Sequence, residues 1–136
     1  MTTPELDPDL VEAPYPFQSH LGFSFSAWRP DYCRLELPLS PELMNRYGIP
    51  HGGVHAAMLD SVMGFAGCYT GDKDAPRLAM TLSLNVNYLG QARGGVLLAE
   101  GYRTGGGRKT FFAEGKITDQ DGNVVATGTG VFRYRS

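Results

Sequence analysis

Residues 51–68 read HGGVHAAMLDSVMGFAGC, and the apolar side chains in this run recur at the spacing of one helical face. The recurring residues are Val54, Met58, Val62 and Phe65. Their spacing predicts an α-helix from Val54 to about Cys68, which would be about 22 Å long at the helical rise per residue. Glycines at positions 52, 53 and 71 flank the run and suit reversals of the chain.

The segments on either side of this helix alternate apolar and polar residues with a period of two, which predicts β-strands. These segments are Leu21–Trp28, Tyr32–Leu39, Met80–Leu89, Val96–Thr104, Thr110–Thr118 and Val124–Tyr134. Asp121 and Gly122 suit the tight turn of a hairpin between the last two strands. The sequence therefore predicts an α+β domain, in which an antiparallel sheet of about six strands wraps around one long central helix.

The composition limits the kind of protein this can be. The chain has 136 residues, enough for one domain, and its net charge of −2 argues against a nucleic-acid binder. We expect a flexible, proline- and acid-rich N-terminal arm at residues 1–16 and a single domain at residues 17–136. No membrane span or secretory signal is recognisable, so a cytoplasmic location is expected. Cys33 and Cys68 form no CxxC motif, and 18 glycines are many for this length.

Asp60 is the acidic residue of the expected helix, and small side chains surround it. Ala56, Ala57 and Gly64 lie about one turn away, so a second subunit or a ligand can approach the helix closely there. A carboxylate in such a place is partly removed from water, which suits a general base. The alternative is a structural aspartate that caps a local break or pairs with an arginine.

His51, Gly52 and Gly53 stand where the helix is expected to begin. Backbone N–H groups at a helix start lack intrahelical partners and lie at the positive end of the helix dipole. Glycines let a carbonyl group approach these donors, each of which stabilises an oxyanion by about 3–4 kcal/mol. The alternative is a glycine-rich turn that only bends the chain.

Two further patterns point less directly to function. His51 and His55 are four residues apart, but the run HGGVH lacks the glutamate of HExxH and has no third ligand nearby, so neither a metal nor another cofactor is expected. The run GGGRKT at residues 105–110 lacks the spacing of a phosphate-binding loop and lies between two strands. We expect it to be a basic hairpin, whose Arg108 and Lys109 can still meet a phosphate group.

The order of these motifs resembles the hotdog-fold acyl-CoA thioesterases, in the PaaI-like branch typified by the phenylacetate-pathway enzyme. The resemblance runs from about Phe17 to Tyr134. It is carried by an asparagine six residues before His51, an aspartate nine residues after it and a strand that reads TLSLNVNYL from residue 81. It implies hydrolysis of an acyl-CoA or aryl-acyl-CoA thioester to the free acid and CoA, by a dimer or tetramer with active sites at the subunit interface.

The resemblance also assigns roles to residues near the helix start. Asp60 would act as general base or nucleophile. The N–H of Gly53, together with that of Gly52, would polarise the thioester carbonyl. Asn45 and His51 would position the carbonyl group or the attacking water.

Other assignments are less definite. A hydroxyl group near the start of the strand would assist, and the sequence offers both Thr81 and Ser83 for this role. Arg108 and Lys109 would lie near the nucleotide part of CoA. His55 departs from the family pattern, which has a small or apolar residue there, and this leaves the acyl preference open.

Two other functions remain as alternatives. The first is a hotdog domain that binds acyl-CoA without catalysis. The second is an acyl-CoA hydratase, which needs a histidine paired with a carboxylate. His51 and Asp60 are nine residues apart, on roughly opposite sides of an ideal helix, so they would not form such a pair.

Overall fold

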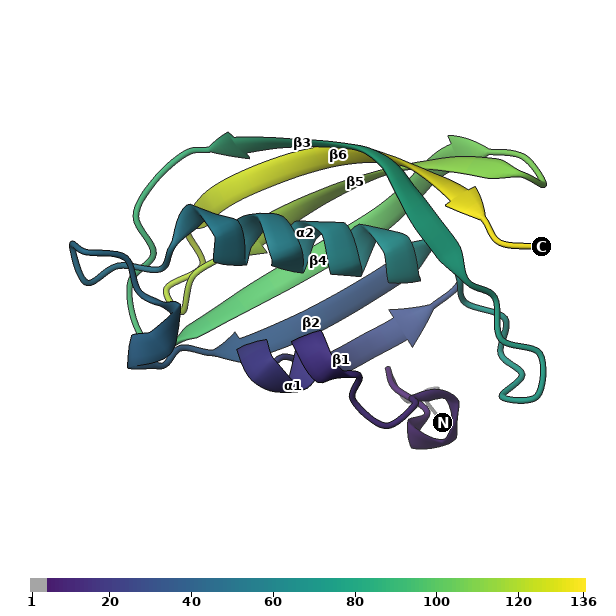
Figure 1. Ribbon diagram of the computed structural model, residues 1–136, viewed down its shortest axis with the longest axis horizontal. Helices are drawn as coiled ribbons and strands as arrows, with labels where there is room; N and C mark the ends of the chain where they lie inside the picture. Colours follow the sequence, from purple (N-terminus) through teal and green to yellow (C-terminus); the bar gives the residue numbers. More distant parts are fainter. Residues whose placement is uncertain (1–4) are drawn as a thin grey trace.

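The computed structural model describes residues 5–136. A six-stranded antiparallel sheet, in the order β1-β2-β4-β5-β6-β3, packs against one long helix, α2 (Figure 1). In chain order the elements are η1 Pro8–Leu10, α1 Pro16–Leu21, β1 Ser24–Arg29, β2 Tyr32–Pro38, η2 Pro41–Leu43, α2 Gly52–Ala66, β3 Ala79–Tyr88, β4 Val96–Gly106, β5 Thr110–Thr118 and β6 Val124–Tyr134. The expected α+β architecture is confirmed. Within the described residues, no helix has the length and apolar character needed to cross a membrane.

The N-terminal region differs from the expectation. Residues 16–21 form helix α1, although Leu21 was expected to open the first strand. Pro16 suits the first turn of a helix, and Gly22 ends the helix in the left-handed conformation with φ 96°. Strand β1 therefore begins only at Ser24. Residues 1–4 of the expected arm lie outside the described part of the chain.

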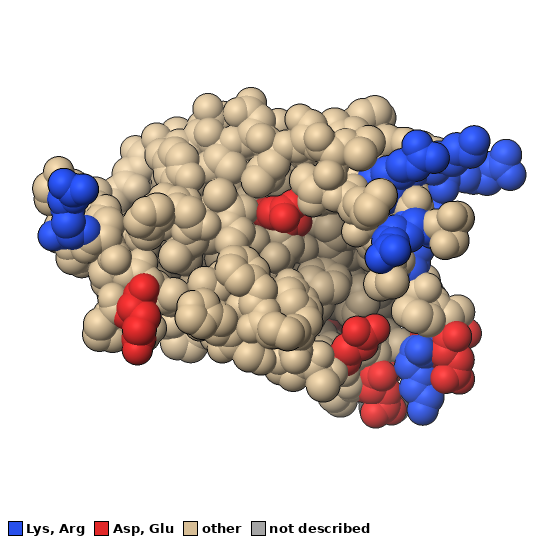
Figure 2. Space-filling view, viewed as in Figure 1, with Lys and Arg blue, Asp and Glu red and all other residues tan. Residues whose placement is uncertain are grey.

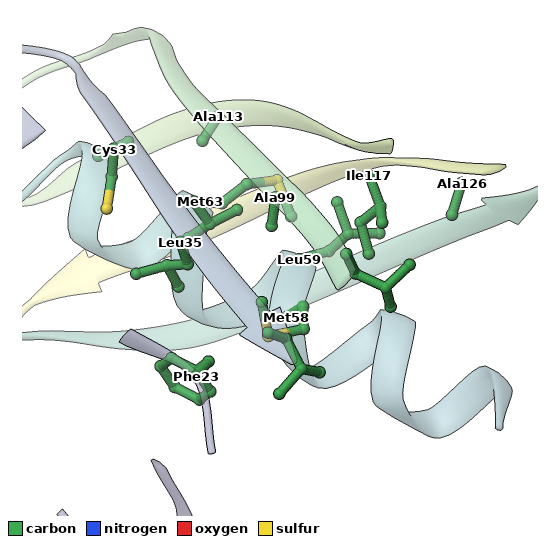
Figure 3. Packing of buried hydrophobic residues seen from close by; sticks show 14 of the residues in the cluster. Phe23, Cys33, Leu35, Met58, Leu59, Met63, Ala99, Ala113, Ile117 and Ala126 are labelled. Carbon is green, nitrogen blue, oxygen red and sulfur yellow. The ribbon is translucent and has the colours of Figure 1, made fainter. Parts of the chain in front are cut away.

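Glycines in the sheet let α2 pack closely against it. A Cβ atom on Gly101 would lie 2.5 Å from the carbonyl oxygen of Val62, and one on Gly115 would lie 3.2 Å from the side chains of Leu59 and Met63. The same helix side chains contact a set of buried sheet residues that includes Ala99, Ala113, Ile117 and Ala126 (Figure 3). Part of the high glycine content is therefore explained by this helix–sheet contact.

Strand β3 forms one edge of the sheet, with β6 as its neighbour. It carries the expected alternation, but much of its apolar surface is exposed: Met80 is 49% exposed, Leu82 57% and Tyr88 55%. The register with β6 shifts between Thr81 and Ser83, as it does at a β-bulge. An exposed apolar strand at the edge of a sheet is a surface that favours pairing with another chain.

Candidate active site

Asp60 of α2 and Thr81 of β3 are joined by a hydrogen bond. The Thr81 hydroxyl donates to Oδ1 of Asp60 at 2.6 Å, a short distance that is typical of a carboxylate acceptor. Asp60 is half-buried. Between the two candidate hydroxyl groups, Thr81 contacts this carboxylate, whereas Ser83 makes no hydrogen bond to it in the described structure. Within residues 5–136, Oδ2 of Asp60 has no hydrogen-bond partner and can meet another group.

The Asp60 carboxylate lies in the wall of a hollow of about 250 Å³. Helix α2, the start of β3 and residues 77–79 line this hollow, and Ser61 and Gly64 lie beside the carboxylate. In the middle of the molecular face over α2 an acidic side chain stands among uncharged ones, whereas basic side chains gather mainly at the right-hand end and further acidic side chains lie toward both ends (Figure 2). A carboxylate in this setting is available to a neutral or apolar ligand.

The start of α2 uses one of the two expected glycine donors internally. His51 is the N-cap residue, and its Nδ1 accepts the N–H of Gly53 at 2.8 Å. Because Nδ1 is an acceptor, the neutral His51 ring carries its proton on Nε2. The N–H of Val54 donates to the His51 carbonyl oxygen at 2.9 Å. Among the described residues, the N–H of Gly52 has no hydrogen-bond partner, so Gly52 rather than Gly53 offers the free donor.

Tyr88 of β3 fixes the position of this helix start, a role that the sequence analysis did not identify. Its hydroxyl donates to the carbonyl oxygen of Gly52 at 2.7 Å. Its ring lies 3.3 Å from where a Cβ on Gly52 would be, and its centroid is 5.9 Å from that of His55. The sequence carries no signal for these contacts, because they join residues of different elements.

Asn45 shapes the loop that precedes α2. Its Oδ1 accepts the N–H of Tyr47 at 2.8 Å and that of Ile49 at 3.4 Å. Its backbone N–H donates to the Ile49 carbonyl oxygen at 2.8 Å. The side-chain oxygen of Asn45 is therefore used within the loop, and its NH₂ group is the part that remains for a ligand.

His55 is buried, and its ring bonds to the backbone of His51 and not to the His51 ring. It is 5% exposed, and its Nδ1–H donates to the His51 carbonyl oxygen at 3.3 Å. Its Nε2 is buried and has no hydrogen-bond partner among residues 5–136. Burial lowers the pKa of His55 below its usual value, although the bond to His51 opposes this shift. Anywhere within residues 5–136, no group of three or more histidine, cysteine, aspartate or glutamate side chains is placed to hold a metal ion.

Arg108 and Lys109 lie at the β4–β5 hairpin and do not line the Asp60 hollow. Arg77, which the sequence analysis did not single out, connects the two regions. It lines the hollow, donates to the Arg108 carbonyl oxygen at 3.1 Å and places its guanidinium 3.4 Å from the ring centroid of Tyr134. Arg77 lies in a loop without any recognisable motif, so no sequence signal marked it.

Comparison with known proteins identifies the family to which this chain belongs. Residues 47–126, more than half of the chain, match the model of the thioesterase superfamily. The chain belongs to this superfamily. A Mycobacterium tuberculosis protein named "putative esterase" is 28% identical over 114 residues, which are 83% of this chain and 81% of that protein. A Haemophilus influenzae protein with the same description is 30% identical over 81 residues, 60% of this chain and 57% of that protein.

Three solved structures share the fold of this chain. A conserved protein of Pseudomonas aeruginosa superposes with a TM-score of 0.80 at 24% identity, covering 93% of this chain and 97% of its own. A thioesterase of H. influenzae superposes with a TM-score of 0.79 at 22% identity, covering 88% of this chain and 82% of its own. The PaaI protein from the E. coli phenylacetic acid degradation operon superposes with a TM-score of 0.77 at 16% identity, covering 88% of this chain and 84% of its own. These likenesses confirm the hotdog fold, whereas PaaI is only a distant neighbour and the expected PaaI-like branch is not supported.

Membership of the superfamily supports thioester hydrolysis as the class of reaction. The described residues offer three groups of kinds that such a reaction can use: the Asp60 carboxylate, the Thr81 hydroxyl bonded to it and the N–H of Gly52. These groups do not all lie together in one chain. Gly52 and Asp60 are eight residues apart in α2, which is about 12 Å along the helix axis.

Proposed function

We propose that the protein hydrolyses an acyl-CoA thioester to the free acid and CoA, with Asp60 as general base or nucleophile. The observation that carries the proposal is the Asp60 carboxylate, which the Thr81 hydroxyl orients in the wall of an open hollow. A base positioned in this way contributes about 10²–10⁴-fold to the rate. Because Thr81 occupies Oδ1, Oδ2 is the oxygen that meets water or the thioester.

The reaction needs no group beyond those of the chain, the substrate and water. As general base, Asp60 takes a proton while the water oxygen bonds to the carbonyl carbon. The C–S bond then breaks, and the CoA thiolate leaves and gains a proton. As nucleophile, Asp60 would form an anhydride that water then hydrolyses. In both cases the oxyanion accepts a hydrogen bond from a helix-start N–H, and Gly52 is the donor we favour because the His51 ring occupies Gly53.

The separation of about 12 Å between Gly52 and Asp60 means that one thioester carbonyl cannot contact both groups in the same chain. We therefore propose a dimer in which the start of α2 in one protomer faces Asp60 of the other, as a two-fold axis allows. The exposed apolar side chains of β3, such as Leu82 at 57% exposure, supply the surface for this association. A tetramer would form from two such dimers.

The remaining candidate residues bind or position the substrate in this proposal. The NH₂ group of Asn45 and the Nε2–H of His51 can donate to the carbonyl oxygen or to the attacking water. Arg108 and Lys109, joined by Arg77, provide positive charge for the phosphates of CoA.

The test is release of free thiol from a panel of acyl-CoA thioesters, with the wild-type protein and Asp60→Asn measured together. We expect Asp60→Asn to lower kcat at least about 100-fold, with an unchanged melting temperature because the substitution is nearly isosteric. Thr81→Val should cost about tenfold, since it removes one hydrogen bond to a charged group. Ser83→Ala distinguishes the two candidate hydroxyl groups and should cost less than Thr81→Val.

Two results would contradict the proposal. Wild-type turnover by Asp60→Asn would remove Asp60 from the chemistry. Binding of acyl-CoA by the wild-type protein without any release of thiol would favour the alternative of a non-catalytic acyl-CoA-binding domain.

A further inference from the structure

Arg77 places a positive charge in the same hollow as the Asp60 carboxylate. Both residues line the hollow of about 250 Å³, and every other residue that lines it is uncharged. Within residues 5–136, no carboxylate lies within ion-pair distance of the Arg77 guanidinium. The hollow therefore contains one acidic and one basic side chain, and the basic one has no partner of opposite charge among the described residues.

Two contacts hold the Arg77 guanidinium in place. Its central carbon lies 3.4 Å from the ring centroid of Tyr134, and its Nη2 donates to the Arg108 carbonyl oxygen at 3.1 Å. Tyr134 is itself fixed, because its hydroxyl donates to the Gly67 carbonyl oxygen at 2.6 Å and its backbone N–H to that of Lys109 at 2.8 Å. A guanidinium that is already oriented loses little side-chain freedom when it binds a ligand.

These contacts leave the hydrogen-bonding edge of the Arg77 guanidinium available. The Tyr134 ring covers one face of the group, and the Arg108 carbonyl oxygen uses one of its five N–H groups. At least one adjacent pair of N–H groups therefore remains for the two-oxygen contact that a carboxylate makes with arginine.

Arg77 and Asp60 lie at opposite ends of the hollow. Tyr134, which stacks on Arg77, bonds to Gly67, and Gly67 lies about 10 Å beyond Asp60 along α2. Cys68 also lies beside the guanidinium: burial raises the pKa of its thiol to about 11, and the positive charge of Arg77 opposes this rise. An acyl group that starts at Asp60 and follows α2 therefore ends near Arg77.

The neighbouring hollow, of about 150 Å³, is a less favourable place for an anion. Arg77 lines it too, but so do Asp9, Glu12 and Asp72, together with Lys73. Like charges disfavour an anionic ligand among these three carboxylates. None of them lines the Asp60 hollow, so we expect an anionic group to reach Arg77 from the Asp60 side.

We propose that Arg77 binds a carboxylate at the far end of the acyl group, so that the preferred substrates are CoA thioesters of dicarboxylic acids; this rests on the hydrolase function proposed above. Asp60 repels the acyl carboxylate and Arg77 attracts it, which directs the neutral thioester to Asp60. An uncharged acyl end would cover the Arg77 charge without pairing it, which costs free energy. The phosphates of CoA are the competing partners, but the whole pantetheine arm separates them from the thioester.

The first test compares acyl groups of matched length on the wild-type protein. Thiol release is measured with glutaryl-, adipyl- and suberyl-CoA and with valeryl-, hexanoyl- and octanoyl-CoA, in which a methyl group replaces the terminal carboxylate. We expect kcat/KM to be at least about tenfold higher for the dicarboxylic member of at least one pair, as a hydrogen-bonded charge pair provides. Hydrolysis without this preference in any pair would overturn the carboxylate site.

The second test compares Arg77→Met with Arg108→Met. In Arg77→Met, the ratio of kcat/KM for the preferred dicarboxylic thioester to that for its monocarboxylic counterpart should fall about 10–100-fold. Arg77→Lys keeps the charge without the planar group and should retain part of the preference. Arg108→Met removes an equal charge from a residue that lines neither hollow and keeps the carbonyl oxygen that Arg77 contacts, so its ratio should match the wild type. An equal loss for both members of the pair in Arg77→Met would assign Arg77 to the CoA phosphates and overturn the proposal.

Binding measurements separate this inference from the hydrolase function. Asp60→Asn is titrated with adipyl-CoA and hexanoyl-CoA in a calorimeter, and the double variant Asp60→Asn/Arg77→Met is treated in the same way. We expect Asp60→Asn to bind adipyl-CoA at least about tenfold more tightly and the double variant to lose this preference. Selective binding without hydrolysis of any thioester by the wild-type protein would overturn the hydrolase and support the carboxylate site. Hydrolysis with equal binding of the two thioesters would overturn the site and leave the hydrolase.

Discussion

Gly52 offers a backbone N–H whose contribution can be measured with a single substitution. It occupies the first position of α2, where proline is well tolerated because its missing N–H would be unpaired in any case. His51 before it has φ −63° and ψ 139°, which a following proline permits. We expect Gly52→Pro to lower kcat about 100-fold by removing the oxyanion donor, with a melting temperature within a few degrees of wild type.

Gly52→Ala is the matched control for this substitution. It brings a similar contact with the Tyr88 ring, 3.3 Å from the Cβ position, but keeps the N–H. Its kcat should therefore lie well above that of Gly52→Pro. Equal losses in the two variants would instead indicate that crowding against Tyr88 matters and that the donor lies elsewhere, with Gly53 the remaining candidate.

His55 makes stability depend on pH in a predictable direction. Burial lowers the pKa of His55 in the folded protein below the value of about 6.5 that it has when unfolded. The unfolded state therefore binds more protons than the folded state at pH values below about 6.5. The free energy of unfolding should fall as the pH drops through this region, by at most about 1.4 kcal/mol per pH unit from this residue.

Urea unfolding at pH 7.5, 6.5 and 5.5 measures this dependence, and His55→Leu is the comparison. The slope between pH 6.5 and 5.5 should be smaller in His55→Leu than in the wild-type protein. Asp119, whose pKa is lowered in the folded protein, affects the free energy of unfolding only in more acidic solution. A carboxylate of this kind loses its stabilising effect as the pH falls through its folded-state pKa. Identical slopes in the two proteins would show that His55 takes up its proton in the folded state without a penalty.

At the scale of the elements, the contact of α2 with the sheet depends on glycine. A Cβ on Gly101 would meet the Val62 carbonyl oxygen at 2.5 Å, and neither backbone can move without disturbing its own hydrogen bonds. We expect Gly101→Ala to lower the free energy of unfolding by about 1–3 kcal/mol, as overpacking does. Denaturant unfolding measures the change. Gly90→Ala is the control, because nothing lies within 4 Å of a Cβ there, and it should change stability by less than about 0.5 kcal/mol.

The elements themselves could be predicted because their periodicity is local. The alternation of β4, β5 and β6 and the helical spacing in α2 follow from the sequence alone. The strand prediction failed at residues 21–23, because Leu21 and Phe23 alternate in phase with β1 and Gly22 was not recognised as the end of a helix.

The site was less accessible from the sequence, because its contacts join distant residues. The choice between Thr81 and Ser83 depends on the bulge in β3, which shifts the register with β6 and cannot be read from the alternation. The preference for Gly52 over Gly53 depends on the orientation of the His51 ring. Asp60 and the glycines at the helix start were recognisable because their spacing lies within one element.

At the scale of the whole molecule, the positions of Asp60 and Gly52 determine what assembly the proposed chemistry needs. The two residues lie about 12 Å apart along α2, and β3 leaves an apolar edge uncovered beside Thr81. Pairing of two such edges around a two-fold axis would bury this surface and place two α2 helices side by side. Each site would then combine Asp60 and Thr81 of one protomer with the helix start of the other.

This arrangement predicts complementation between two inactive variants. In a heterodimer of Asp60→Asn and Gly52→Pro, one site would receive the intact Asp60 from one chain and the intact Gly52 from the other, while the second site would lack both. We expect a heterodimer purified through two different affinity tags to show about half of the wild-type kcat per dimer, because one of two equivalent sites is restored. Each variant alone should be nearly inactive, and wild-type protein carrying the same two tags sets the reference. An inactive heterodimer would mean that the base and the oxyanion donor of each site come from the same chain. The donor would then have to lie within reach of Asp60 and not at the start of α2.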